Sequence, residues 1–187
     1  IDLGIAIGRD DKTLFAIFNL SEIYILQGLY DKAEAIALKG LQINPNDAKI
    51  NNSLGNVYME WGLNDKAIIY YNNALEHSKQ LGDNYSAPLH NIGMIYSRVG
   101  KNEEAIEYFN KSIDYMKNEL LHADAIGKES LNSDLGYAML HLAGDHYQLG
   151  NVDTSFALLD SIMNVYDSNN IYHNNVNFMM ELVDLLS

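Results

Sequence analysis

Histidines are the side chains here with the widest chemical repertoire, because imidazole acts both as a general base and as a metal ligand. The six are His77, His90, His122, His141, His146 and His173. None forms the His-Glu-x-x-His pattern of zinc hydrolases, and the five-residue spacing of His141 and His146 does not place them on one helix face. The sequence also has no cysteine and no glycine-rich phosphate-binding loop. These observations predict a protein that is not an enzyme and that holds neither metal nor cofactor.

The net charge of the chain argues against nucleic acids and anionic membranes as binding partners. The 187 residues include 12 Lys and Arg against 25 Asp and Glu, a net charge of −13. Such a chain is a poor match for phosphate backbones or anionic membrane surfaces. No Lys or Arg follows Lys128, so the acidic residues from Glu129 onward form either a solvated face or a docking surface for a basic partner.

The ends of the chain bear on its context. No apolar run reaches the ~18 residues of a transmembrane helix, and the sequence does not start with a signal peptide. The first residue is Ile1 rather than Met, so we expect a piece of a longer protein. The compartment stays open between cytoplasm and periplasm.

A short pattern recurs along the chain. A Leu or Ile precedes a small residue, with a Tyr or His three residues further on, then a Gly, and finally a small residue at the start of the next segment. The last position is occupied by Ala33, Ala67, Ala105 and Ser155, at offsets of 34, 38 and 50 residues. A fixed period in this range indicates stacked copies of one structural unit.

Each copy reads as two helices. Apolar and small residues fall at spacings of three and four, and a glycine between the halves is expected to end the first helix. These glycines are Gly28, Gly62, Gly100 and Gly150. Asn64, Asn102 and Asn151 are expected to be N-caps of the second helices. Small residues such as Gly55 and Gly93 fall where two helices must approach closely, and large ones such as Tyr71 and Phe109 are expected to fill the gaps next to them.

This pattern resembles the tetratricopeptide repeat, strongly over residues 14–119 and weakly over 136–167. Asn44-Pro45-Asn46-Asp47 matches the terminal proline turn of such a repeat. The resemblance implies an all-α fold, a right-handed superhelical solenoid of antiparallel helix hairpins. The longer spacing around residues 79–84 is similar to the roughly forty-residue repeats of bacterial regulatory proteins.

We interpret residues 1–187 as a single array of such repeats. Its expected parts are a remnant of a preceding helix (1–12), repeats over 13–46, 47–84, 85–126 and 128–168, and a capping helix over 171–187. Asp10-Asp11 is expected to be an interhelix turn, and Gly127 to end a long helix that reaches residue 126. The 16 extra residues of the last hairpin are expected to lengthen each of its helices by about two turns.

The resemblance further implies a concave groove lined by the first helix of each pair. The candidate peptide-binding residues are Phe15, Phe18, Glu22, Lys49, Asn52, Asn56, Met59, His90, Met94, Arg98 and Tyr137. Asn52 and Asn56 lie one turn apart, so their amides could hold a peptide backbone by paired hydrogen bonds. The alternative for Phe15 and Phe18 is burial against a helix preceding residue 10 or against a missing upstream repeat.

We therefore expect a non-enzymatic scaffold that binds a protein or peptide. Family members that bind chaperones clamp a carboxylate with Lys, Asn and Arg. Asn56 matches one such Asn, but the Lys and Arg positions hold Phe18, Glu22, Ala87 and Asn91, so an acidic tail is not the expected ligand. The resemblance to bacterial repeat regions suggests the sensing or interaction segment of a larger signalling or transcription-regulatory protein. The alternative is an architectural module that self-associates as a homo-oligomer. No nucleic acid binding through this segment and no membrane insertion are expected.

Overall fold

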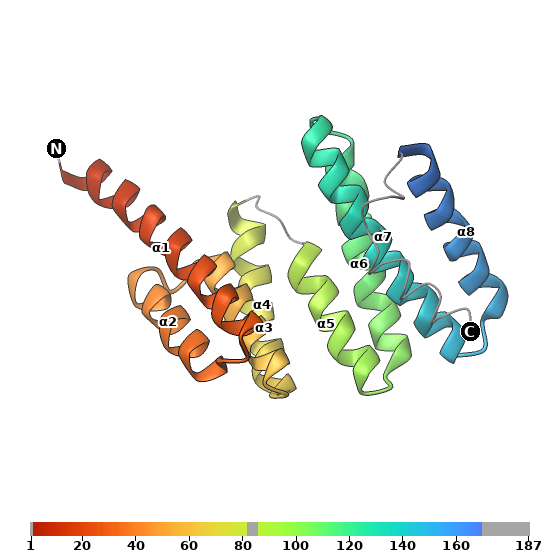
Figure 1. Cartoon of the computed structure of the whole chain (residues 1–187), viewed down its shortest axis with the longest axis horizontal. Helices are drawn as coiled ribbons and strands as arrows, with labels where there is room; N and C mark the ends of the chain where they lie inside the picture. The colour runs from red at the N-terminus through yellow and green to blue at the C-terminus, as the bar shows by residue number, and fades with distance from the viewer. Residues whose placement is uncertain (1, 82–85, 170–187) are drawn as a thin grey trace. The chain divides into compact units, whose positions relative to one another are not determined.

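The computed structural model describes residues 2–81 and 86–169, and all regular structure in these ranges is α-helical. Consecutive helices form antiparallel hairpins joined by short turns (Figure 1). The all-α hairpin fold is thus confirmed. The helices are α1 (Asp2–Leu26), α2 (Tyr30–Ile43), α3 (Ala48–Glu60), α4 (Asn64–Leu81), α5 (Ser86–Arg98), α6 (Asn102–Leu120), α7 (Ala125–Gln148) and α8 (Val152–Asn169).

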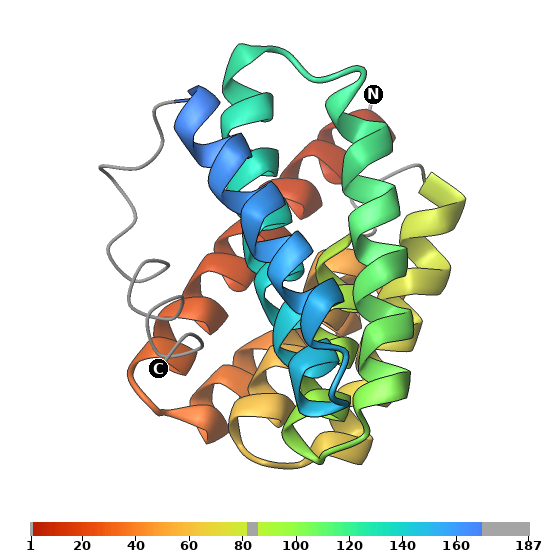
Figure 2. The same cartoon turned by 90° about the vertical axis from the view of Figure 1, so that its right-hand side faces the viewer.

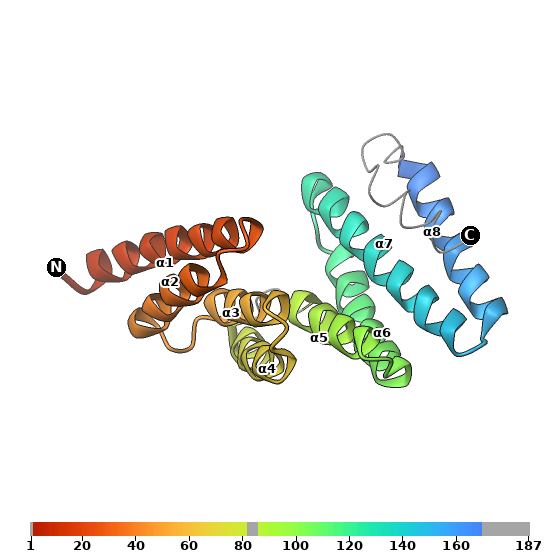
Figure 3. The same cartoon turned by 60° about the horizontal axis from the view of Figure 1, so that its bottom comes forward.

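The contacts divide the chain into two compact units, the first ending at Asn91 and the second beginning at Ile92, within α5. In the first unit α1 packs against α2 and α3, and α3 packs against α4 (Figure 3). In the second unit α7 packs against both α6 and α8 (Figure 2). None of the described helices combines the length and the apolar character that crossing a bilayer requires.

Glycines close the first helix of each hairpin, as predicted. Gly28, Gly62, Gly100 and Gly150 all have φ between +69° and +79°, the left-handed region that costs glycine least. The residue after each glycine donates its backbone N–H to a carbonyl in the last turn of the preceding helix, as from Leu29 to Tyr24 at 2.9 Å. This closure satisfies carbonyl groups that the helix end would otherwise leave unpaired.

Close packing inside the hairpins depends on small residues that face rings. A Cβ added to Gly55 would lie 2.4 Å from the ring of Tyr71, and one added to Gly93 would lie 2.7 Å from the ring of Phe109. Both rings are fully buried. The pairing of small and large residues expected from the repeat is therefore the contact on which α3 meets α4 and α5 meets α6.

The predicted turn at Asp10-Asp11 is wrong, because α1 runs unbroken from Asp2 to Leu26. No Gly or Pro interrupts that segment after Gly8, and two aspartates do not by themselves end a helix. The first turns of α1 extend beyond the end of α2 (Figure 1). The division of the array into repeats stays a prediction.

The helix end predicted at Gly127 is also wrong. α6 ends at Leu120, and Gly127 lies in the first turn of α7, where its N–H donates to Asp124 Oδ1 at 2.8 Å. An aspartate cap thus starts a helix where the sequence had suggested a glycine stop. The extra length of the last hairpin falls mainly in its first helix, since α7 has 24 residues against 13 in α3 and α5.

Two of the three predicted asparagine caps are wrong by one residue. Asn64 and Asn102 are the first residues of α4 and α6, so the capping positions are Leu63 and Lys101, and Lys101 makes no side-chain cap. The turn after the left-handed glycine is too short to leave Asn102 outside the helix. The predicted capping helix, 171–187, lies outside the described residues.

Candidate functional site

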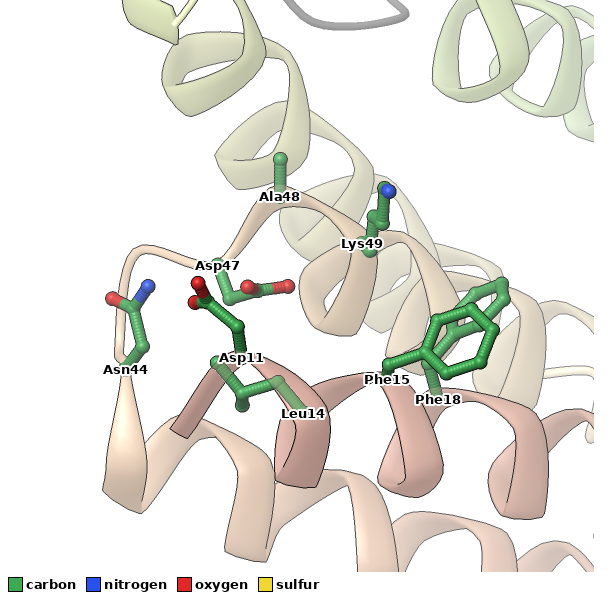
Figure 4. A pocket seen from close by; sticks show the side chains of 8 residues that line it. All are labelled: Asp11, Leu14, Phe15, Phe18, Asn44, Asp47, Ala48 and Lys49. Atoms are coloured by element: carbon green, nitrogen blue, oxygen red, sulfur yellow. The ribbon is translucent and has the colours of Figure 1, made fainter. Parts of the chain in front are cut away.

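Four of the groove residues predicted on α1 and α3, namely Phe15, Phe18, Lys49 and Asn52, line a cavity of the first unit. This Phe15–Phe18 pocket has a volume of about 340 Å³ and lies between α1, α3, α4 and α5. Its lining comprises Phe15, Phe18, Ala48, Lys49, Asn52, Ser78, Ala87 and Pro88. Phe15 and Phe18 extend from α1 toward the side where Lys49 lies, next to a second hollow bordered by Asp11 and Asp47 (Figure 4).

Phe15 is the most informative residue of this pocket. Its side chain is 65% exposed, whereas Leu14 and Ile17 of the same helix are buried in the hairpin core. Within the described residues, therefore, no preceding helix covers Phe15. A large aromatic ring left in water beside a cavity is a common anchor for a bound partner.

Asn52 provides a polar group in this apolar pocket. Its side-chain oxygen Oδ1 is buried and has no hydrogen-bond partner. A buried acceptor without a donor costs free energy, and a ligand N–H would remove that cost. That the Asn52 amide holds a bound peptide backbone stays a prediction.

Asn56 is occupied within the protein. Its Oδ1 accepts hydrogen bonds from Tyr71 OH at 2.8 Å and from Asn91 Nδ2 at 3.0 Å, and its Nδ2 lies 3.4 Å from Glu22 Oε1. The paired use of Asn52 and Asn56 by one ligand does not fit these contacts. Asn56 instead joins α1, α3, α4 and α5 in one hydrogen-bond network.

Glu22 lies at the end of that network. Besides Asn56, it accepts a hydrogen bond from Ser53 Oγ at 2.8 Å, and Ser53 lies 3.0 Å from the hydroxyl of Ser21. Glu22 and Met59 line a wider hollow of about 700 Å³, the Glu22 pocket, together with Ile25, Leu26, Gln27, Gly28, Tyr30, Asn56, Glu60 and Asn91.

The remaining predicted groove residues are not among those that line these two pockets. His90 is half-buried in the part of α5 that belongs to the first unit. Met94, Arg98 and Tyr137 belong to the second unit, where Met94 and Tyr137 pack against its apolar core and Arg98 is exposed. That all these residues line one groove stays a prediction.

Sequence reasoning missed three partners that organise the site: Ser53, Tyr71 and Asn91. The sequence pattern gives Tyr71 only a packing role, matches Asn91 to a cation position of the family, and gives Ser53 no role in binding. Their hydrogen bonds join positions 15 to 35 residues apart in the sequence, such as Asn91 to Asn56. The only signal available was the repeat offset, which places positions 53 and 91 on the helices that flank the groove.

The second unit holds a buried carboxyl. Asp145 of α7 is 2% exposed; its Oδ1 accepts a hydrogen bond from Ser97 Oγ at 2.8 Å, and its Oδ2 is buried without a partner. Burial raises the pKa of Asp145, and the Ser97 hydrogen bond lowers it by less. One turn away, burial lowers the pKa of His141, and the charge of Arg98 lowers it further. Within the described ranges no three His, Asp or Glu side chains gather as a metal site would require.

Comparison with known proteins decides the family. The tetratricopeptide repeat family matches residues 16–47 and residues 46–118, together more than half of the chain. The chain belongs to the tetratricopeptide repeat family. Members of this family are generally non-enzymatic scaffolds for protein interactions, and the hairpins described here have the helix-pair fold of the family.

Solved structures share the fold of this repeat protein. The crystal structure of MamA is 16% identical with a TM-score of 0.65, and the match covers 85% of this chain and 81% of MamA. Aspartyl phosphate phosphatase F from Bacillus subtilis is 18% identical with a TM-score of 0.78 over 95% of this chain, which spans 45% of the phosphatase. A comparison with curated proteins gives no match.

Proposed function

We propose that the repeat protein binds a peptide segment of a partner protein through the Phe15–Phe18 pocket, without catalysing a reaction. The observation that carries this proposal is the exposed ring of Phe15 beside the buried, unpartnered Oδ1 of Asn52. An apolar surface next to a backbone acceptor suits an extended segment, whose side chain can enter the pocket while its N–H meets the amide oxygen.

Affinity capture from cells that express the protein tests this proposal. The bait is the chain itself, compared with Phe15→Ala/Asn52→Ala, and mass spectrometry identifies what each retains. Ile69→Ala is the matched control, because Ile69 is also exposed, at 58%, but lies on α4 outside the pocket. We expect a partner that the unchanged chain and the control retain and that the double variant loses. Equal retention by all three baits would contradict the proposal.

We further propose that this segment serves sensing or assembly in a larger bacterial signalling or transcription-regulatory protein. Two observations support this proposal. The repeats have the long spacing seen in the sequence, and the fold matches 45% of the chain of a bacterial aspartyl phosphate phosphatase. Reading the gene on both sides of the segment tests this idea. A histidine kinase or DNA-binding region in the same chain would support it, and a chain composed of repeats alone would contradict it.

Self-association is a second candidate function that one observation favours. Val152, Phe156 and Met163 lie at spacings of four and seven on α8, and each is at least 41% exposed. An apolar stripe of this kind on a helix surface suits contact with a second copy. Sedimentation at increasing protein concentration tests it: a rising mass that Phe156→Ala reduces would support self-association, and a constant monomer mass would contradict it.

A further inference from the structure

A negatively charged side chain without a counter-charge lies in the groove of the first unit. Glu22 is half-buried on α1, and its hydrogen-bond partners are neutral, the hydroxyl of Ser53 and the amide of Asn56. In the described part of the chain, no Lys, Arg or His pairs with this carboxylate. A partly buried charge that lacks an opposite charge is costly, and a cation supplied by a ligand would lower that cost.

The network beneath Glu22 holds its carboxylate in place. Asn56 receives hydrogen bonds on its Oδ1 from Tyr71 and Asn91, which orients its Nδ2 toward Glu22. Ser53 binds the same carboxylate oxygen from α3. One carboxylate oxygen is therefore fixed by protein groups, and the carboxylate is positioned before any ligand arrives. Such preorganisation reduces the entropy that binding must otherwise overcome.

The distance from Glu22 to Phe15 and Phe18 determines how far apart the apolar and the basic side chains of a bound peptide must be. Along α1, Glu22 follows Phe18 by four residues and Phe15 by seven, which corresponds to about 6 and about 10 Å of helix rise. An extended peptide advances about 3.3 Å per residue. Side chains two or three residues apart in such a peptide thus span the distance from the Phe15–Phe18 pocket to the Glu22 pocket.

We propose that the groove selects a partner segment in which a Lys or Arg lies two or three residues from a large apolar side chain. The apolar side chain enters the Phe15–Phe18 pocket, the cation meets Glu22, and a backbone N–H between them meets Asn52. This inference rests on the proposed peptide-binding function and adds the chemical class of the ligand. The net charge of −13 favours the same class, because it attracts a basic segment at long range.

Selection from random seven-residue peptides displayed on phage tests the inference. The targets are the unchanged chain, Glu22→Gln and Glu76→Gln. Gln at position 22 keeps an oxygen that accepts from Ser53 and Asn56, so the fold is expected to persist, and far-ultraviolet circular dichroism with thermal unfolding checks this. Glu76→Gln removes the same charge from an exposed position on α4 that lines neither pocket, so it is the matched control.

We expect the unchanged chain and Glu76→Gln to enrich the same consensus, an aromatic or large aliphatic residue two or three positions from Lys or Arg. Glu22→Gln is expected to keep the apolar preference, to lose the basic one, and to bind the selected peptides about tenfold more weakly. An apolar consensus with no basic residue, or a basic consensus that Glu22→Gln preserves, would overturn the inference and leave peptide binding intact. Failure to enrich any peptide whose binding Phe15→Ala weakens would overturn both.

Discussion

Gly55 faces the ring of Tyr71 with no room for a side chain. A Cβ at this position would lie 2.4 Å from ring carbon atoms of a side chain that is fully buried. The hydroxyl of the same ring donates to Asn56, so the ring cannot move without disturbing the groove network. One residue pair thus links core packing to the proposed binding site.

Gly55→Ala is therefore expected to destabilise the protein by about 1–3 kcal/mol through overpacking. Urea denaturation measures the change in unfolding free energy. The same substitution made in Tyr71→Ala, where the ring is gone, should cost much less. An equal cost in both backgrounds would show that the clash is not its cause.

Asp145 predicts a dependence of stability on pH. Burial raises its pKa in the folded protein above the ordinary value of about 3.9 in the unfolded chain. Between these two pKa values the folded state binds more protons, so the unfolding free energy falls as the pH rises through this interval and stays lower above it.

Asp145→Asn removes this titration while leaving an oxygen to accept from Ser97. We expect the variant to be more stable than the unchanged chain at pH 7, with a smaller advantage at pH 4. Urea denaturation at several pH values measures the difference, in which the opposite contribution of His141 cancels. If the difference in unfolding free energy between the variant and the unchanged chain does not vary with pH, the raised pKa of Asp145 is contradicted.

Helix ends are the elements that sequence reasoning placed least well. The four left-handed glycines were identified correctly because their positions recur with the repeat. The start of α7 was missed because Asp124 lies in the inserted segment, where no other repeat supplies a comparison. Asn102 was assigned as a cap from residue type alone, although the turn geometry makes it the first helical residue.

Substitutions of Asp124 and Asn102 are expected to differ in their effect on the free energy of unfolding. Asp124 caps α7 through its bond to the N–H of Gly127, so Asp124→Ala is expected to cost about 1 kcal/mol. Asn102→Ala, inside α6, should change the unfolding free energy by less than about 0.5 kcal/mol. Chemical denaturation of the two variants compares them, and a larger loss for Asn102→Ala would mean that α6 is capped differently.

At the scale of the whole molecule, the fold could be predicted because the same residue pattern occurs in several copies along the chain. Small residues, rings and turn glycines returned at matching offsets, and each copy supported the others. The candidate site could be predicted only as a row of positions on one face. Which side chains bind one another there, as Asn56 does with Tyr71 and Asn91, depends on tertiary contacts that no single helix pattern contains.

The central claim is that the first unit binds its partner at Phe15. Site-specific photocrosslinking tests it most directly, with a benzophenone amino acid in place of Phe15 in one sample and of Phe156 in another, in cells that express the protein. Both positions are exposed, so both probes can be accommodated. We predict a crosslinked partner from position 15 that a selected basic–apolar peptide displaces. A partner crosslinked only from position 156 would contradict the account.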